Sequence, residues 1–104
     1  MLFGRKKENR QRMQQLLALH GQAIRYVTER RDGNDDVVGR GGSLSVKDDE
    51  FLIFASADII FRAKLSTVTS SMLLSGDGVV LTGNDLTRGG EERSVIAYFV
   101  YHRK

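Results

Sequence analysis

Hydrophobic residues follow a helical period near the start of the chain. Apolar positions spaced three or four residues apart over residues 9–20 predict an amphipathic helix. They are Met13, Leu16, Leu17 and, closing the same face, His20. Asn9 is suited to cap the start of this helix and Gly21 to end it. Because cations oppose the positive end of a helix dipole, we expect residues 1–8 to form a basic tail outside the helix.

Residues 22–30 fit either a helix or a strand. Ile24 continues the apolar face of the helix, but Ile24, Tyr26 and Thr28 also share one side of an extended strand. The dipeptide Asp32-Gly33 that follows is a strong hairpin signal. We therefore predict a strand and keep the helical extension as the alternative.

The rest of the chain alternates short apolar runs with turn residues, a pattern typical of an antiparallel meander. Strands are expected at residues 43–47, 51–55, 59–63, 68–74, 79–82 and 93–102. Turns or loops are expected at residues 48–49, 56–58, 76–78, 83–85 and 88–90. We predict an α+β, mostly β fold, with one N-terminal helix followed by a bent antiparallel sheet of six or seven short strands, curled into a small barrel or roll. This single helix-plus-β domain covers residues 9–104, after the tail of residues 1–8.

The last predicted strand is apolar on both sides. Val95, Ala97 and Phe99 point to one face of it, and Ile96 and Tyr98 point to the other. We expect this strand to lie inside the sheet with both faces covered, and Phe99 to be a core residue.

The composition narrows the class of protein. A chain of 104 residues is long enough for one domain with a hydrophobic core. The lack of cysteine excludes disulfides, thiol nucleophiles and thiolate metal sites, and it favours a reducing, cytoplasmic setting. No signal peptide is visible, and the longest apolar run, residues 95–101, is far shorter than the ~20 residues of a membrane-spanning helix.

The net charge of +3 conceals an uneven distribution. Residues 1–31 hold eight basic and two acidic residues (+6), residues 32–58 hold two basic and seven acidic (−5), and residues 59–104 hold six basic and four acidic (+2). A basic head beside an acidic middle segment can bind an external anion, or be neutralised within the chain or between subunits.

Two loops resemble ligand-binding motifs but do not complete them. Residues 32–36 place oxygen ligands as a calcium loop does, but Val37 and Ser43 stand where its glycine and its glutamate are needed. Residues 39–42 do not form a dinucleotide-binding fingerprint, because a predicted strand follows them where a helix is required. We expect a solvated hairpin tip at the first loop, and at the second a bulge or a close approach of a neighbouring strand. No metal site and no cofactor are predicted.

Residues that commonly act as catalysts are not spaced as in a catalytic motif. His20 and His102 are the two imidazoles, and an acid/base or metal site would require them to meet Asp58 or the carboxylates of residues 48–50. The hydroxyl residues in 66–71 lack the glycines and the acid and histidine partners of a nucleophile motif, and fit the exposed face of an edge strand. We expect structural histidines and no enzymatic activity.

The basic segment near the N-terminus is the strongest candidate for a binding role. Such a segment neutralises phosphates, or an anionic lipid surface with Leu2 and Phe3 as apolar anchors, and the alternative is a solubilising terminus. The candidate contacts for an anion or a nucleic acid are Arg5, Lys6, Lys7, Arg10, Arg12 and Arg40.

The leading hypothesis is a small intracellular binding or assembly module without catalytic activity, which self-associates or binds a protein partner through its apolar helix face or its strand edges. The alternative, less favoured, is a nucleic-acid-binding accessory protein that uses the basic N-terminal segment. The helix-then-strands order is similar to that of Sm-type small barrels, but the motifs of that family are absent. A pleckstrin-homology-like barrel has a similar strand count and carries its helix at the other end, so neither family is assigned.

Overall fold

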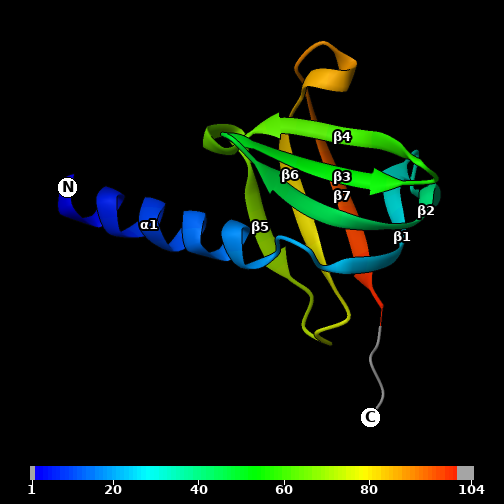
Figure 1. The fold of residues 1–104 in the computed structure, drawn as a ribbon, viewed down its shortest axis with the longest axis horizontal. Coiled ribbons are helices and arrows are strands. Elements are labelled where there is room, and N and C mark those ends of the chain that lie inside the picture. The colour runs from blue at the N-terminus through cyan, green and yellow to red at the C-terminus, as the bar shows by residue number, and fades with distance from the viewer. Residues whose placement is uncertain (1, 101–104) are drawn as a thin grey trace.

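The computed structural model describes the backbone of residues 2–100 and the side chains of residues 9–100. A single α-helix precedes seven strands and two short 3-10 helices (Figure 1). In chain order the elements are α1 (Leu2–Ala18), β1 (Ala23–Arg31), β2 (Asn34–Lys47), β3 (Glu50–Ala55), β4 (Asp58–Lys64), η1 (Leu65–Thr67), β5 (Thr69–Met72), β6 (Gly78–Asp85), η2 (Leu86–Arg88) and β7 (Glu91–Phe99). The predicted α+β, mostly β fold is confirmed.

The strands form one antiparallel sheet in the order β4-β3-β2-β1-β7-β6-β5. The sheet is curled, so that β4 comes to lie against β6 although the two strands are not paired. It does not close into a barrel, since β4 and β5 remain its two edges. The C-terminal half of α1 lies beside the edge strand β5 (Figure 1). The predicted bent sheet has therefore formed an open roll.

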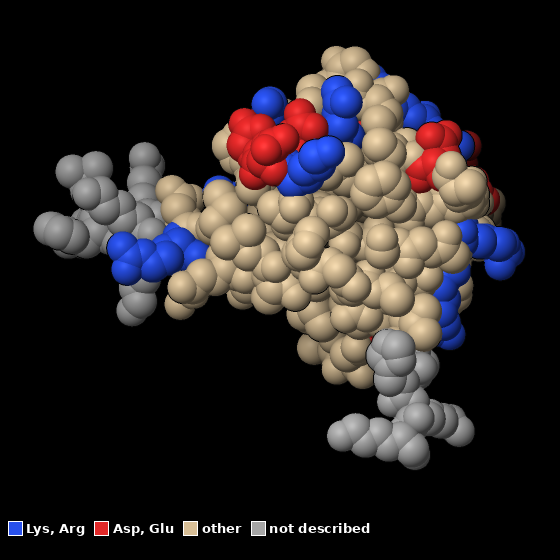
Figure 2. All heavy atoms as spheres, viewed as in Figure 1, with Lys and Arg blue, Asp and Glu red and all other residues tan. Residues whose placement is uncertain are grey.

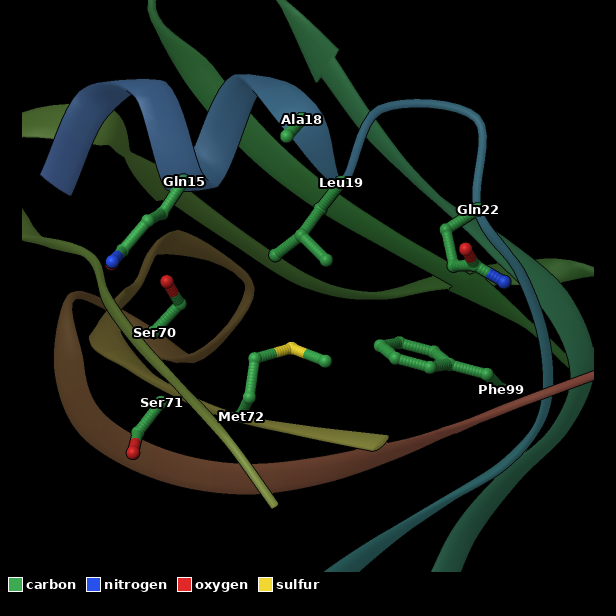
Figure 3. A pocket seen from close by; sticks show the side chains of 8 residues that line it. All are labelled: Gln15, Ala18, Leu19, Gln22, Ser70, Ser71, Met72 and Phe99. Carbon is green, nitrogen blue, oxygen red and sulfur yellow. The ribbon is translucent and has the colours of Figure 1, made fainter. Parts of the chain in front are cut away.

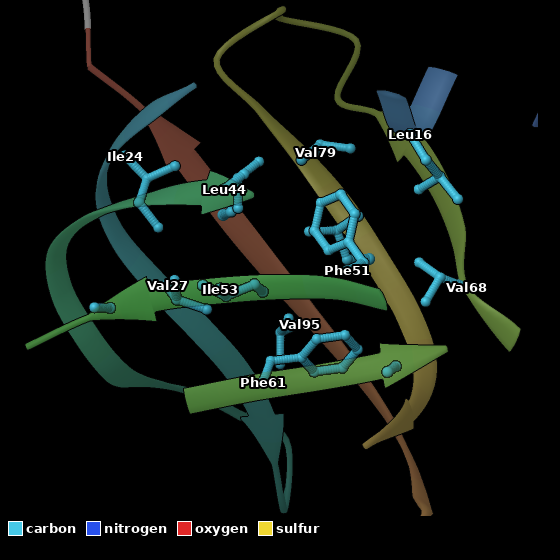
Figure 4. Packing of buried hydrophobic residues seen from close by; sticks show 14 of the residues in the cluster. Leu16, Ile24, Val27, Leu44, Phe51, Ile53, Phe61, Val68, Val79 and Val95 are labelled. Carbon is cyan, nitrogen blue, oxygen red and sulfur yellow. The ribbon is translucent and has the colours of Figure 1, made fainter. Parts of the chain in front are cut away.

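Side chains from the whole curled sheet meet in one hydrophobic core (Figure 4). Phe51 and Phe61 are its largest fully buried side chains. Among the described side chains of α1, Leu16 is the one that is fully buried, and it lies near Val68. Partly buried apolar residues such as Met13 surround that contact.

Strand β7 is central, between β1 and β6, as predicted. Val95 and Ala97 are buried, but Tyr98 on the opposite face is only partly covered. The expectation of two covered faces is wrong, because an open antiparallel sheet packs its core on one side and leaves the other to water. Phe99 is partly buried and packs at the rim of the core. Residues 101–102 of the predicted strand lie outside the described residues.

Helix α1 begins earlier than predicted. It starts at Leu2, so Asn9 lies within it and is not its N-cap, and it ends at Ala18. The strong helix-forming residues of this segment outweigh the unfavourable position of its cations at the positive end of the dipole. Gly21 does not end the helix as predicted: it lies three residues beyond Ala18, and its N–H donates to the carbonyl oxygen of Leu44 in β2 (2.8 Å). Its φ of 85° instead shapes the turn into β1. The N-terminal half of α1 projects beyond β5 (Figure 1), and the boundary predicted after residue 8 falls inside this continuous helix.

The segment predicted as a strand at residues 22–30 forms β1 (Ala23–Arg31), and Asp32-Gly33 makes the hairpin turn to β2 with φ values of 51° and 82°. Strand β2 begins at Asn34, well before the predicted residue 43. The added part is polar and rich in glycine, which disfavours a strand locally, and its pairing with β1 overrides that preference. The loop predicted at residues 83–85 is wrong, since β6 continues to Asp85.

The glycines of β2 permit a close approach of neighbouring strands, as predicted. A Cβ atom on Gly42 would lie 1.8 Å from the carbonyl oxygen of Phe54 in β3. Pairing of β1 with β2 also shifts register between Val27 and Thr28, opposite Gly39, which is the predicted bulge. These residues therefore serve the curvature of the sheet.

Candidate functional site

A hollow of about 550 Å³ opens between the C-terminal end of α1, strand β5 and the end of β7 (Figure 3). Leu19 points into it from the helix side, and Met72 extends from β5 toward Phe99 of β7. Its lining is mainly apolar, and none of the lining side chains carries a charge. We call this hollow the α1–β5 groove. Its lining includes Gln15, Ala18, Leu19, Gln22, Met72 and Phe99.

Strand β5 borders the groove with backbone groups that no other strand uses. The N–H of Leu73 donates to the carbonyl oxygen of Gly78 at the β6 end of the hairpin (3.0 Å). Hydrogen-bonded pairs alternate along an antiparallel ladder, so Ser71 exchanges hydrogen bonds with β6. The N–H and C=O groups of Ser70 and Met72 point to the other edge of β5, away from β6. Within residues 2–100 no strand pairs with that edge of β5. The side chains of Ser70 and Met72 face the groove, and that of Ser71 points away (Figure 3).

Two residues of α1 fix the helix beside β5. Nη1 of Arg12 donates to the carbonyl oxygens of Leu65 (2.6 Å) and Val68 (2.8 Å), just before β5 begins. Leu16, one turn further along the helix, is fully buried. Both contacts lie near the start of β5, so the helix and the strand leave the groove open further along, toward Met72.

The concave surface continues along α1 toward its basic half. A second, shallower concavity of about 380 Å³ is lined by Gln11, Gln14, Gln15 and Ala18. Gln15 and Ala18 also line the α1–β5 groove, so the two concavities adjoin. Figure 2 shows charged side chains gathered above this region, whereas the surface where the helix joins the body is largely uncharged. Arg10, which precedes the lining residue Gln11 on α1, is exposed.

A buried ionic cluster, formed by Glu29, Asp85 and Arg93, lies where β4 meets β6 and η2. Arg93 donates to Asp85 (Nη1–Oδ2, 2.5 Å), to Glu29 (Nε–Oε2, 3.0 Å; Nη2–Oε1, 2.7 Å) and to the carbonyl oxygen of Ile60 (3.0 Å). Asp85, which is fully buried, also accepts from the N–H and hydroxyl of Thr87. All buried side-chain polar atoms in the described residues have partners. The cluster therefore joins β1, β4, β6 and β7.

The charges of the cluster are mutually stabilised. The hydrogen bond from Arg93 is the largest influence on Glu29 and lowers its pKa from 4.5 to about 2, against a smaller opposing effect of burial. For Asp85 burial is the largest influence and opposes ionisation, but hydrogen bonds from Thr87 and Arg93 outweigh it and lower the pKa. The pKa of Arg93 is raised, mainly by its hydrogen bond to Glu29. Both carboxylates therefore stay ionised at neutral pH, as a structural role requires.

Among the candidate anion contacts whose side chains are described, Arg40 lies apart from Arg10 and Arg12. Arg10 is exposed on α1, while Arg12 on the same helix holds backbone carbonyls of the body. Arg40 lies in β2 beside the β3–β4 turn, where its N–H donates to Ser56 Oγ (2.9 Å). That turn is on the opposite side of the molecule from the free end of α1 (Figure 1). The side chains of residues 5–7 lie outside the described residues, and the anion-binding role of the whole set stays a prediction.

The described histidine has a structural contact. Nδ1 of His20 accepts a hydrogen bond from the N–H of Val46 (2.9 Å), which ties the end of α1 to β2. An acid/base site would require His20 to meet the carboxylates of residues 48–50, but Asp49 pairs instead with Lys64 (3.2 Å). Within the described part of the chain, no three His, Cys, Asp or Glu side chains are placed to hold a metal ion. His102 lies outside the described residues.

Sequence reasoning missed both the groove and the ionic cluster. The cluster had a signal, because Arg93 shares a strand face with the apolar residues Val95 and Ala97, and a buried arginine requires acceptors. The groove had none, since it combines polar and apolar positions from three distant segments, and only the curling of the sheet brings them together.

The comparisons with known proteins add no assignment. No protein family, curated protein or solved structure matches the chain. In the described residues, no helix is both long enough and apolar enough to cross a membrane.

Proposed function

We propose that this chain is a small, non-catalytic, intracellular interaction module that binds a protein partner in the α1–β5 groove. The observation that carries the proposal is the combination of an uncharged, mainly apolar hollow with a strand edge whose backbone groups are unused. An exposed strand edge is a template for another chain, and an apolar hollow beside it supplies side-chain contacts. The most exposed apolar residues nearby, Met72 and Leu74, enlarge this surface.

Other features support a binding role more than a catalytic one. The imidazole of His20 and the carboxylates of the ionic cluster are engaged in contacts that hold the fold together. The groove itself offers amides, hydroxyls and apolar side chains, which suit recognition. The lack of cysteine is consistent with the cytoplasmic setting proposed here.

Selection from a random peptide library displayed on phage tests the proposal. Selected peptides are expected to bind the chain and to perturb backbone amide resonances of α1 and β5. Ala18→Arg, which places a charged side chain in the groove, is expected to weaken binding at least about tenfold, since a buried unpaired charge is costly. Val37→Arg, at an exposed position on β2, is the matched control. Failure to enrich any peptide, or equal affinity of both variants, would contradict the proposal.

The protein partner can be a second copy of this chain, which is the self-association predicted from the sequence. Sedimentation of the same two variants tests it. A wild-type dimer that Ala18→Arg dissociates and Val37→Arg preserves would show that the groove serves it.

A second candidate function, nucleic-acid binding, is favoured by one observation. The N-terminal half of α1, whose sequence is basic, projects from the body of the protein where a duplex has access to it. Deletion of residues 1–7 removes three cations and should lower the slope of log K against log salt by roughly 2.7 on duplex DNA, since each phosphate contact contributes about 0.9. Absence of salt-sensitive binding by the full chain would eliminate this candidate.

A further inference from the structure

We infer that the groove binds its partner by strand addition: an extended segment pairs antiparallel with the free edge of β5, places two apolar side chains in the hollow, and continues into acidic residues beside the basic half of α1. The inference rests on the proposed function and specifies the class of ligand. Each part of it follows from a different feature of the groove.

The backbone groups of β5 fix the hydrogen bonds. Ser70 and Met72 each present one N–H and one C=O on the edge away from β6. Two ligand residues, separated by one, can each exchange two hydrogen bonds with these residues. The amide of the ligand residue between them points away from β5 and forms no bond with it.

The same register fixes which ligand side chains enter the groove. Residues directly opposite each other in an antiparallel pair project to the same face of the sheet. Ser70 and Met72 project into the groove (Figure 3), so the ligand residues opposite them do too, toward Leu19 and Phe99. Because the groove is mainly apolar and its lining is uncharged, these two ligand residues are apolar. The residue between them faces solvent, where most side chains are tolerated.

The direction of the ligand follows from how α1 lies along β5. Arg12 of α1 contacts Val68 before β5 begins, and Leu19, just after α1, lies near Met72 at the end of β5, so earlier turns of the helix meet earlier positions of the strand. An antiparallel ligand therefore enters at Met72 and leaves past Arg12. It then meets the exposed Arg10 and a helix segment with three further cations in its sequence. Acidic residues on the C-terminal side of the apolar pair complement that charge.

A synthetic peptide tests the mode of binding. The probe is a capped ten-residue peptide with valines two positions apart, separated by a serine and followed by three aspartates. N-methylation of the amide of either valine removes a hydrogen bond to β5 and is expected to weaken binding at least about tenfold. N-methylation of the serine amide between them is the matched control and should change affinity less than about threefold. Equal effects of the three methyl groups, or no binding of the unmodified peptide at millimolar concentration, would overturn the inference.

Variants of the protein test the same contacts from the other side. Ser70→Pro removes an N–H that the β5–β6 ladder does not use, a position where an edge strand accepts proline. It should keep the melting temperature within a few degrees and weaken peptide binding at least about tenfold. Thr69→Ala, at an exposed position of β5 outside the lining of the groove, should change neither. A folded Ser70→Pro variant that binds the peptide as well as wild type would exclude strand addition.

The acidic part of the ligand is tested separately. Arg10→Glu should weaken binding of the aspartate peptide several-fold at low salt, and should leave a peptide with asparagines in place of the aspartates unaffected. Equal effects on both peptides would overturn the predicted polarity of the ligand. Peptides from the library that bind the groove without alternating apolar residues would contradict strand addition while leaving the proposed function intact. Failure of the library selection itself would contradict the proposed function.

Discussion

Single residues decide how the ends of the curled sheet are held together, and Arg93 is the clearest case. Its side chain is 5% exposed, and its guanidinium donates to two carboxylates and a carbonyl from three different strands. Replacing it leaves the fully buried Asp85 with a charge and no cation beside it. The cost of such a change is larger than the net stabilisation by the intact pair, because the remaining charge is already desolvated.

We expect Arg93→Ala to lower the free energy of unfolding by about 3–5 kcal/mol, the range for breaking a buried ion pair from one side. Urea denaturation of the two proteins measures the difference. Arg88→Ala, at an exposed position in η2, is the control and should cost less than about 0.5 kcal/mol. A midpoint for Arg93→Ala near that of the control would mean that the cluster does not stabilise the fold.

Glu29 makes stability depend on pH in the acid range. Its pKa is lowered from 4.5 to about 2 in the folded protein, so its contribution is complete above about pH 4.5 and is lost as the pH falls toward 2. The full contribution is about 3 kcal/mol, at about 1.4 kcal/mol per unit of pKa. Glu29→Gln should therefore be less stable than wild type at pH 6, with the gap narrowing between pH 4.5 and 2. A gap that stays constant over that range would contradict the ionised state of Glu29.

Gly42 tests the close packing of β2 against β3. A methyl group there meets the backbone of Phe54, which cannot move without breaking the ladder. Gly42→Ala should lower stability by more than about 3 kcal/mol, above the usual 1–3 kcal/mol cost of overpacking. Gly41→Ala, with a φ of 58° and open space around it, should cost only about 1–2 kcal/mol for its left-handed conformation. Equal effects of the two substitutions would show that β2 and β3 separate easily.

At the scale of elements, β7 contributes to both the core and the groove: Val95 and Ala97 are buried in the core, and Phe99 lines the groove. Phe99→Ala, at the rim, is expected to cost no more than about half of what Phe51→Ala costs, and the latter should lie within about 3–5 kcal/mol for a fully buried aromatic. Phe99→Ala should also weaken peptide binding, because Phe99 lines the groove. Thermal unfolding and a peptide titration of both variants check this division. A larger loss of stability at Phe99 would place it in the core after all.

The elements also show what the sequence can predict. Turns marked by Asp32-Gly33 and residues 48–49 were predicted correctly, because positive φ values select a few residue types and the signal is local. The start of β2 was not predicted correctly, since its polar and glycine residues form a strand only when they pair with β1. The early start of α1 was missed because a local electrostatic penalty was weighted above the helical propensity of a longer segment.

For the whole molecule, the order of the sheet determines where a binding surface forms. The meander leaves β4 and β5 as its two edges. Curling brings β4 against β6, while β5 remains beside the helix and keeps its edge next to a hollow. Residues that are far apart in the sequence thus form one surface, which explains why periodicity predicts the fold class and not the groove.

The projecting N-terminal part of α1 is expected to contribute to ligand binding and little to the stability of the fold. Among the described side chains, those of residues 9–100, Arg12 is the first that contacts the body and Leu16 is the first that is fully buried. Residues 1–7 lie before both, and their three cations oppose the dipole of their own helix. We therefore expect deletion of residues 1–7 to change the melting temperature by less than about 4 °C, which corresponds to at most about 1 kcal/mol in a domain of this size.

Leu16→Ala provides the comparison for that deletion, because it removes a fully buried side chain from the same helix. It should cost about 2–5 kcal/mol and lower the melting temperature by at least about 8 °C. The deletion should instead reduce the affinity for an acidic ligand, because it leaves the apolar groove intact and removes the cations beyond it. A truncated protein that melts as early as Leu16→Ala would show that the first two turns of α1 are docked on the body. Their cations would then be part of the fold, and the acidic end of the proposed ligand would have to be abandoned.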